Sequence, residues 1–185
     1  VKNHKTRQVM RKKRNLISHQ DTLSACQFIL CALKANQYFQ QSKTIGIYWG
    51  IDNEIPIQKI ITQIYNKQQT FYLPKTSAKE GILTFLPYKP EDEMSRDYHN
   101  IPCPKDEKFP LLPQKLDLAI IPLIACNDKQ YRMGYGGGFY DKSFSNAPDT
   151  HLIGIGYDFQ LSADFTECPH DLKLNEVLLA PTTII

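Results

Sequence analysis

The chain has 185 residues, of which 42% are hydrophobic and 22% are charged, with 12 prolines and 9 glycines. This balance is typical of a globular protein and excludes collagen-like, coiled-coil and disordered chains. The net charge is +3, but residues 1–20 hold seven of the 22 Lys and Arg and no acid. No apolar run approaches the roughly 18 residues of a membrane span, and no apolar segment of a signal peptide follows the basic N-terminus. We therefore expect a cytoplasmic protein with one domain, 1–185, that needs no disulfide or structural metal to fold.

The first 40 residues predict two helices. One is expected over 5–17, where bases surround a short apolar stripe and neither Gly nor Pro interrupts the pattern. A second is expected over 22–39, with Asp21 as its N-cap. The basic residues of the first helix are expected to form a solvated face, and the alternative is a patch that binds nucleic acid or an anionic membrane.

From residue 44 the pattern becomes strand, helix, strand. We expect strands over 44–48 and 70–73, with a helix over 55–67 between them. Such a unit builds a mostly parallel sheet covered by helices.

The second half of the chain predicts four more strands, over 82–86, 116–122, 151–156 and 176–179. Residues 87–113, with six prolines, are expected to form an irregular excursion. The predicted fold class is α/β, a single domain with an open, mostly parallel (mixed) sheet and helices on both faces.

Four of the nine glycines fall within 134–138, in the segment Arg132-Met-Gly-Tyr-Gly-Gly-Gly-Phe-Tyr-Asp141. We expect a short polar loop to connect it to the strand ending at Pro122, and a helix to begin near Phe139. This places the glycines beyond the carboxyl ends of the strands, where open sheets bind ligands. Without side chains, their amides can converge on phosphate oxygens. A phosphate-binding loop is predicted, and a plain glycine turn is the alternative.

The flanking residues favour phosphate, although two standard nucleotide motifs do not fit. Asp141 precedes Lys142 where the Walker A motif needs glycine, and Phe139 stands where the dinucleotide fingerprint needs glycine. Arg132 can form a charge-assisted contact to phosphate, and Asp141 supplies a hard oxygen ligand for magnesium.

The glycine segment resembles the signature R-L-G-x-G-x-G-Y-Y-D of the 5-formyltetrahydrofolate cyclo-ligase family, also called methenyltetrahydrofolate synthetases. Other matches follow in order, among them Arg7 and Arg14, Leu73-Pro-Lys75, and His170-Asp171. The similarity extends over nearly the whole chain.

The resemblance implies an ATP-dependent ring closure on a reduced folate. Phosphate passes from ATP to the formyl oxygen of 5-formyltetrahydrofolate, the anilinic nitrogen attacks, and 5,10-methenyltetrahydrofolate, ADP and phosphate result. The implied cofactor is Mg²⁺ and the implied ligands are ATP and the folate, with no nucleic acid, membrane or obligate protein partner.

The resemblance also implies a role for each matching residue. The ATP-binding positions are Lys2, Lys5, Arg7, Arg14, Arg132, Gly134, Tyr135, Gly136, Gly137, Gly138 and Tyr140. The folate-binding positions are Trp49, Glu54, Tyr135, Gly136, Gly137, Gly138 and Phe139. Asp141 and Asp171 would hold the metal, and Arg132 and Tyr140 would act in catalysis.

Three positions depart from the family pattern and keep other functions open. Asn3 stands where a lysine is usual, Phe139 where a tyrosine is usual, and Cys103 where an acid is usual. One alternative is a module that binds folate and nucleotide without turnover. Another is an RNA-associated protein that uses residues 1–20.

Overall fold

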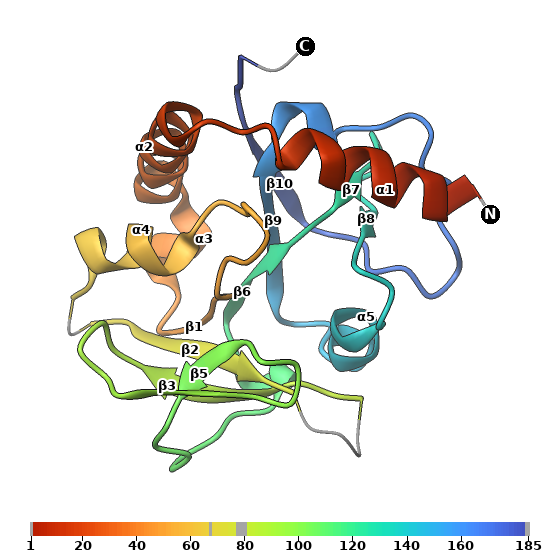
Figure 1. Ribbon diagram of the computed structural model, residues 1–185. Coiled ribbons are helices and arrows are strands. Elements are labelled where there is room, and N and C mark those ends of the chain that lie inside the picture. Colours follow the sequence, from red (N-terminus) through yellow and green to blue (C-terminus); the bar gives the residue numbers. More distant parts are fainter. Residues whose placement is uncertain (1, 67, 77–80, 184–185) are drawn as a thin grey trace.

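The computed structural model describes residues 2–66, 68–76 and 81–183, and of Lys2 only the backbone. A six-stranded sheet in the order β10-β9-β6-β1-β2-β3 forms its centre (Figure 1). All neighbours are parallel except the antiparallel pair of β2 and β3. The strands are β1 (Thr44–Gly46), β2 (Thr70–Lys75), β3 (Thr84–Tyr88), β6 (Leu118–Pro122), β9 (His151–Tyr157) and β10 (Glu176–Ala180). The predicted mixed, mostly parallel sheet is confirmed.

Helices cover both faces of the sheet, as expected. Figure 1 shows α2 (His19–Ala35), α3 (Gln37–Gln41) and α4 (Ile57–Ile64) on one side and α5 (Phe139–Phe144) on the other. The alternation of side chains along β6 separates the two cores. Leu118 and Ile120 pack with α2 and α4, whereas the residues between and after them, Ala119 and Ile121, pack with α5. Both faces of β6 are therefore apolar because each is buried under helices.

The start of the second helix differs from the prediction. Ser18, not Asp21, is the N-cap of α2, because the Ser18 side chain accepts a hydrogen bond from Asp21 N at 3.0 Å. Asp21 lies three residues further on and its carboxylate accepts from Ser18 N at 3.3 Å, which completes a capping box. Aspartate is a residue type that often caps helices, but Asp21 lies in the first turn of α2, three residues after the true cap. The helix before it, α1 (Lys2–Arg14), is displaced toward the N-terminus, because 5–17 was predicted and the helix ends three residues before residue 17.

The excursion over 87–113 is not wholly irregular, which corrects the prediction. β4 (Met94–Arg96) and β5 (Pro102–Pro104) form an antiparallel ribbon in which Met94 opposes Pro104 and Arg96 opposes Pro102. Proline is tolerated here because both strands of a two-stranded ribbon are edge strands. The ribbon packs near β2 and β3 and carries its connecting loop, 97–101, toward α5 (Figure 1).

The connection between β6 and the glycine segment also corrects the prediction of a short polar loop. Residues 123–127 are buried, and β7 (Ala125–Cys126) pairs with β8 (Arg132–Met133). α1 packs across this hairpin, with Met10 against a small core that contains Ile124 and Met133. The hairpin thus brings the basic helix beside the glycines that follow β8. The helix expected from Phe139 is confirmed as α5.

No helix within the described ranges is both long and apolar enough to cross a bilayer.

Candidate active site

A cavity of about 420 Å³ lies beyond the carboxyl ends of β2 and β6. The residues on its walls come from β2, β6, β8, the glycine segment, α5 and three loops. They are Ile51, Pro74, Thr76, Leu83, Asp97, His99, Ile101, Pro122, Arg132, Tyr135, Gly137, Gly138, Phe139 and Tyr140. The glycine segment therefore lies at the predicted edge of the sheet. A mostly apolar cavity with a few convergent polar groups is typical of a small-molecule site.

A buried charge cluster joins α1 to this cavity through Tyr135. Arg14 Nη2 donates a hydrogen bond to the Tyr135 hydroxyl, which donates to Glu54 Oε1 at 2.9 Å. Arg14 Nη1 lies 3.5 Å from the same Glu54 oxygen, and only 2% and 6% of the two charged side chains are exposed. Arg14 also fixes the loop before α4, because its Nε donates to Asp52 O at 2.7 Å. Three segments far apart in sequence are thus tied together.

Burial shifts the acid–base behaviour of this cluster. Desolvation raises the pKa of Glu54, while the Arg14 charge and a hydrogen bond from Ile51 N oppose the shift. Burial also raises the pKa of Tyr135, and the neighbouring Glu54 charge adds to that effect. The Tyr135 phenol therefore stays protonated near neutral pH and can act only as a hydrogen-bond partner.

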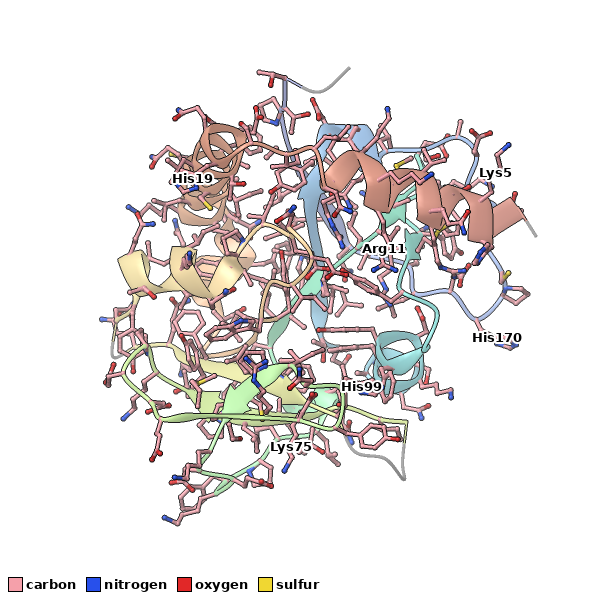
Figure 2. All side chains as sticks on the ribbon, viewed as in Figure 1. Lys5, Arg11, His19, Lys75, His99 and His170 are labelled. Atoms are coloured by element: carbon pink, nitrogen blue, oxygen red, sulfur yellow. The ribbon has the colours of Figure 1, made fainter. Side chains whose placement is uncertain are left out.

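Two further α1 arginines point toward the same region. Arg7 Nε donates to Gly134 O at 2.8 Å. Arg11 pairs with Asp52 at 3.1 Å and lies over the Tyr135 ring, 5.7 Å from its centroid. Figure 2 shows Arg11 on the inner side of α1, with Lys5 near the outer end of the helix. Lys5 is exposed, and the Lys2 side chain lies outside the described residues.

Arg132 anchors the start of the glycine segment from within the protein. It is 3% exposed, and its Nη1 donates to Pro122 O at 2.8 Å. Its Nη2 lies 3.5 Å from Asp141 Oδ2, and its guanidinium lies over the Tyr140 ring, 5.0 Å from the centroid. Burial raises the pKa of Tyr140, although the Arg132 charge opposes the shift. Residues at both ends of the signature are therefore in contact.

Two buried guanidinium N–H groups have no hydrogen-bond partner among the described residues. They are Nη1 of Arg14 and Nε of Arg132. Unpaired buried donors are costly and uncommon. Arg14 Nη1 still faces the Glu54 carboxylate at 3.5 Å, whereas Arg132 Nε has no such partner, and this suits a site near Arg132 that is completed by an anion.

The glycines are required for two different reasons. Gly136 and Gly138 have φ values of +108° and +68°, which other residues rarely adopt. At Gly134, a Cβ would lie 2.6 Å from Arg132 Nη2, so the absence of a side chain there makes room for the buried guanidinium. The segment is therefore a shaped turn whose backbone stays exposed around 135–137.

The two predicted metal ligands lie on neighbouring segments. Asp141 Oδ1 accepts a hydrogen bond from Leu172 N at 3.1 Å, which places Asp141 next to the residue that follows Asp171. Asp171 Oδ2 accepts from Cys168 N at 2.7 Å, and its other oxygen has no hydrogen-bond partner among the described residues. Within those residues, no group of three or more His, Cys, Asp or Glu is placed to hold a metal ion. The described residues therefore form no metal site made of protein ligands alone. Mg²⁺ commonly binds through one or two carboxylates together with phosphate and water oxygens, and Asp141 and Asp171 are of this type.

Some predicted positions lie behind the cavity rather than on its surface. Trp49 packs edge-on against Tyr88, with ring centroids 6.5 Å apart, and joins the core under α2 and α4. Glu54 is connected to the cavity through Tyr135, as described above. Phe139 lines the cavity directly. It presents an aromatic ring there, as the tyrosine of the family signature would, but it lacks the hydroxyl.

Sequence reasoning missed one wall of the cavity. Thr76, Asp97 and His99 line it, and Asp97 and His99 lie in the segment that was expected to be irregular. Asp97 Oδ1 accepts from the backbone N–H groups of both His99 and Ile101, at 2.9 Å each. An aspartate whose side chain bonds the amide two residues later is a turn signal, and it could have marked this loop as ordered.

Comparisons with known proteins agree with the resemblance. A model of the 5-formyltetrahydrofolate cyclo-ligase family matches residues 1–180. The cyclo-ligase of Haemophilus influenzae is 32% identical over 147 residues, which is 78% of this chain and 76% of that protein. The cyclo-ligase of Escherichia coli K12 is 34% identical over 122 residues, covering 64% of this chain and 67% of that protein.

Two solved structures share the fold. The 5,10-methenyltetrahydrofolate synthetase of Aquifex aeolicus aligns with a TM-score of 0.83 at 19% identity, covering 97% of this chain and 90% of that one. The synthetase of Mycoplasma pneumoniae aligns with a TM-score of 0.74 at 24% identity, covering 95% and 96%. With the family match over almost the whole length, these findings show that the chain belongs to the 5-formyltetrahydrofolate cyclo-ligase family.

Proposed function

We propose that this enzyme closes the ring of 5-formyltetrahydrofolate to 5,10-methenyltetrahydrofolate at the expense of ATP, and that it does so in the cytoplasm. Phosphate passes to the formyl oxygen, the anilinic nitrogen bonds to the formyl carbon, and inorganic phosphate leaves with the former carbonyl oxygen. The observation that carries the proposal is the meeting of Arg7, Arg14 and Arg132 at a glycine turn beside a cavity.

The arginines suit a reaction that depends on electrostatics and positioning. Charge spreads over the transferring phosphoryl oxygens, so preorganised cations and backbone amides stabilise the transition state without a protein nucleophile. Arg14 and Arg132 are held rigidly by the contacts described above, and Arg132 Nε has no hydrogen-bond partner among the described residues. In this proposal Arg132 and Tyr140 touch the transferring group, and Arg7, Lys5 and Lys2 serve the rest of the nucleotide.

The folate is proposed to occupy the apolar part of the cavity. Phe139 and Tyr135 offer flat surfaces to a ring, and the Glu54 carboxylate can accept paired N–H bonds from a pterin when the Tyr135 hydroxyl yields its place. Trp49 supports this side from the core. The raised pKa of Glu54 is offset when N–H donors of a ligand add to Arg14.

Asp141 and Asp171 would hold Mg²⁺, whose charge neutralises phosphate oxygens during transfer. Asp171 has one carboxylate oxygen free among the described residues, and Asp141 is bonded by a single backbone N–H and a long contact to Arg132. These oxygens are hard ligands of the kind that Mg²⁺ prefers.

The test is a direct absorbance assay for methenyltetrahydrofolate with ATP, MgCl₂ and 5-formyltetrahydrofolate, coupled to a phosphate measurement. We expect one phosphate released for each methenyl product, with neither formed when ATP or the folate is omitted. Phosphate release that ignores the folate would contradict the ligase reaction. Binding of both ligands without product would favour a non-catalytic module.

The RNA-binding alternative is tested on the same preparation. Binding of RNA through residues 1–20 would be strongly salt-dependent and would survive Asp141→Asn. Arg7 and Arg14 turn toward the glycine segment rather than toward solvent, which favours a small anion over a polyanion. Absence of RNA binding at low salt would remove this alternative.

A further inference from the structure

Hydrogen bonds connect three polar side chains on the cavity wall, those of Asp97, Thr76 and His99. Thr76 Oγ1 donates to Asp97 Oδ2 at 2.5 Å, and His99 Nδ1 lies 2.9 Å from the same hydroxyl. Thr76 is buried at the end of β2, whereas His99 is exposed on the loop between β4 and β5. The His99 ring lies edge-on to Phe139, with centroids 5.0 Å apart. Figure 2 shows His99 between this loop and α5.

The hydrogen-bond donors available to these three side chains determine the tautomer of His99. Asp97 accepts from the backbone N–H groups of Thr76, His99 and Ile101 and from the Thr76 hydroxyl, so its carboxylate acts only as an acceptor. The single hydroxyl proton of Thr76 is thereby committed to Asp97. The hydroxyl must then accept from His99 Nδ1–H, which leaves the lone pair of the neutral ring on Nε2. Nε2 has no hydrogen-bond partner among the described residues.

The other polar side chains on the cavity wall are less suited than His99 to accept a proton. Burial raises the pKa of Tyr135 and of Tyr140, so both phenols hold their protons. Arg132 is a permanent cation. Asp97 and Thr76 are committed to each other and to backbone groups. Among the described lining residues, His99 alone offers a side-chain base with a free lone pair.

The proposed ring closure needs such a base. When the anilinic nitrogen of the folate bonds to the formyl carbon, that nitrogen must lose its proton as the C–O bond to phosphate breaks. The phosphate carries away the electron pair of that bond, and the proton needs an acceptor near the glycine segment. His99 packs against Phe139, the residue that directly follows Gly138.

We propose that His99 is a further catalytic residue, whose Nε2 takes the proton of the attacking nitrogen, with Asp97 and Thr76 as positioning residues that hold the ring in the required tautomer. This inference rests on the proposed function and adds to it the acceptor of the proton. The proton passes from His99 to solvent after product leaves, since the ring is exposed. General base catalysis of this kind contributes about 10²–10⁴-fold to a rate.

The groups that surround His99 are few. Its own loop contributes the Asp97 carboxylate and the exposed Tyr98 ring, whose centroid is 5.1 Å away. β2 contributes Thr76, which does not titrate, and α5 contributes Phe139. Arg132 and Tyr140 lie on other walls of the same cavity.

The experiment follows ADP and methenyltetrahydrofolate separately in a single turnover, using the full chain with ATP, MgCl₂ and 5-formyltetrahydrofolate. For His99→Ala we expect ADP to form within about twofold of the normal rate, because phosphoryl transfer precedes the proton step. Methenyl formation should be slower by about 10²-fold, and added imidazole should restore part of it. His99→Gln, which keeps the bulk of the side chain, should show the same separation of the two steps.

Two more variants sharpen the result. Thr76→Val removes the acceptor of Nδ1–H, so we expect a several-fold slower ring closure and a changed pH–rate profile, with ADP formation unaffected. His19→Gln, at an exposed histidine on α2 far from His99 in Figure 2, should leave both steps unchanged.

Ring closure by His99→Ala at the normal rate would overturn the assignment. So would an equal slowing of ADP and methenyl formation with an unaltered pH profile and no rescue by imidazole, because His99 would then only shape the cavity. Failure of the unmodified enzyme to form methenyl product from ATP would instead contradict the proposed function.

Discussion

The two walls of the cavity are built in different ways. On the α1 side, Arg14, Glu54 and Tyr135 come from segments up to 121 residues apart, and the Arg14 and Glu54 charges are almost fully buried. On the opposite side, Asp97, His99 and Ile101 belong to one short loop, and only Thr76 comes from elsewhere, 21 residues away from Asp97. Removing one partner of a buried ion pair leaves the other charge buried and uncompensated, which is costly. The loop over 97–101 is held by one aspartate and lies nearer to solvent, so a change there is expected to cost less stability. We therefore expect damage to the first wall to affect both stability and activity.

The largest effect is expected where the charged wall meets the proposed metal. Asp141→Asn removes a proposed metal ligand but keeps an acceptor for Leu172 N, so the fold should be retained. We expect the rate of methenyl formation to fall by about 10³-fold, as when a dominant electrostatic contact in a transition state is lost. Steady-state assays across a MgCl₂ series, with thermal unfolding in parallel, check this. Asp128→Asn, at an exposed aspartate, is the control, and near-normal rates at low magnesium would refute the ligand assignment.

The second effect separates buried from exposed arginines on α1. Arg14→Ala leaves the Glu54 carboxylate buried without its cation, and we expect a loss of about 3 kcal/mol in the free energy of unfolding. Arg11→Ala removes an ion pair whose side chains are 54% and 44% exposed and should cost less than about 1 kcal/mol. Urea denaturation at pH 7.5 measures both. Equal losses for the two variants would show that the charged wall is not the more demanding one.

The third effect concerns glycines with positive φ. Gly136→Ala, at φ +108°, and Gly81→Ala, at φ +62°, both force a strained backbone and should each lose about 1 kcal/mol of stability. Only Gly136→Ala disturbs the proposed phosphate-binding backbone, so only this variant should raise the KM for ATP, by about tenfold or about 1.4 kcal/mol. A KM for ATP that changes equally in both variants, or in neither, would argue against phosphate binding at this turn.

The smallest effect is a pH dependence that comes from Glu54. Its pKa is raised in the folded protein, so the native state binds the proton more tightly than the unfolded chain does. The resulting stability is present below about pH 4.5, the ordinary value, and is lost as the pH rises through the raised pKa. Glu54→Gln should flatten this part of the curve of unfolding free energy against pH, whatever constant offset the substitution adds. An unchanged slope would mean that Glu54 titrates normally.

Much of the fold could be predicted because its signals are local. The helical spacing before residue 67 and the apolar runs at Leu118–Pro122 and His151–Tyr157 each identify an element by its own residues. The predicted cap at Asp21 was wrong because Ser18 and Asp21 bond each other, and sequence alone does not say which of the two is the cap. The β4–β5 ribbon was missed because its prolines read as irregular chain, although a two-stranded ribbon has room for them.

The candidate site also has one part that local sequence predicts and one part that it does not. The glycine segment was recognisable because glycines, Arg132 and Asp141 lie within ten residues and form a motif. His99 and Thr76 carried no such signal, since their hydrogen bond connects a strand end to a loop 23 residues later. The direct role predicted for Trp49 stays a prediction, because its ring packs in the core behind the cavity.

The order of residues by itself determined the α/β alternation, the glycine motif and the family, because each depends on residue type and spacing along the chain. Tertiary structure alone decided which charges meet. Arg14 reaches Glu54 and Tyr135 only because α1 packs across the β7–β8 hairpin, and His99 faces the cavity only because the β4–β5 ribbon folds back over β2. Burial and distance set the strength of these contacts. Both arise when segments that are far apart along the chain pack against each other.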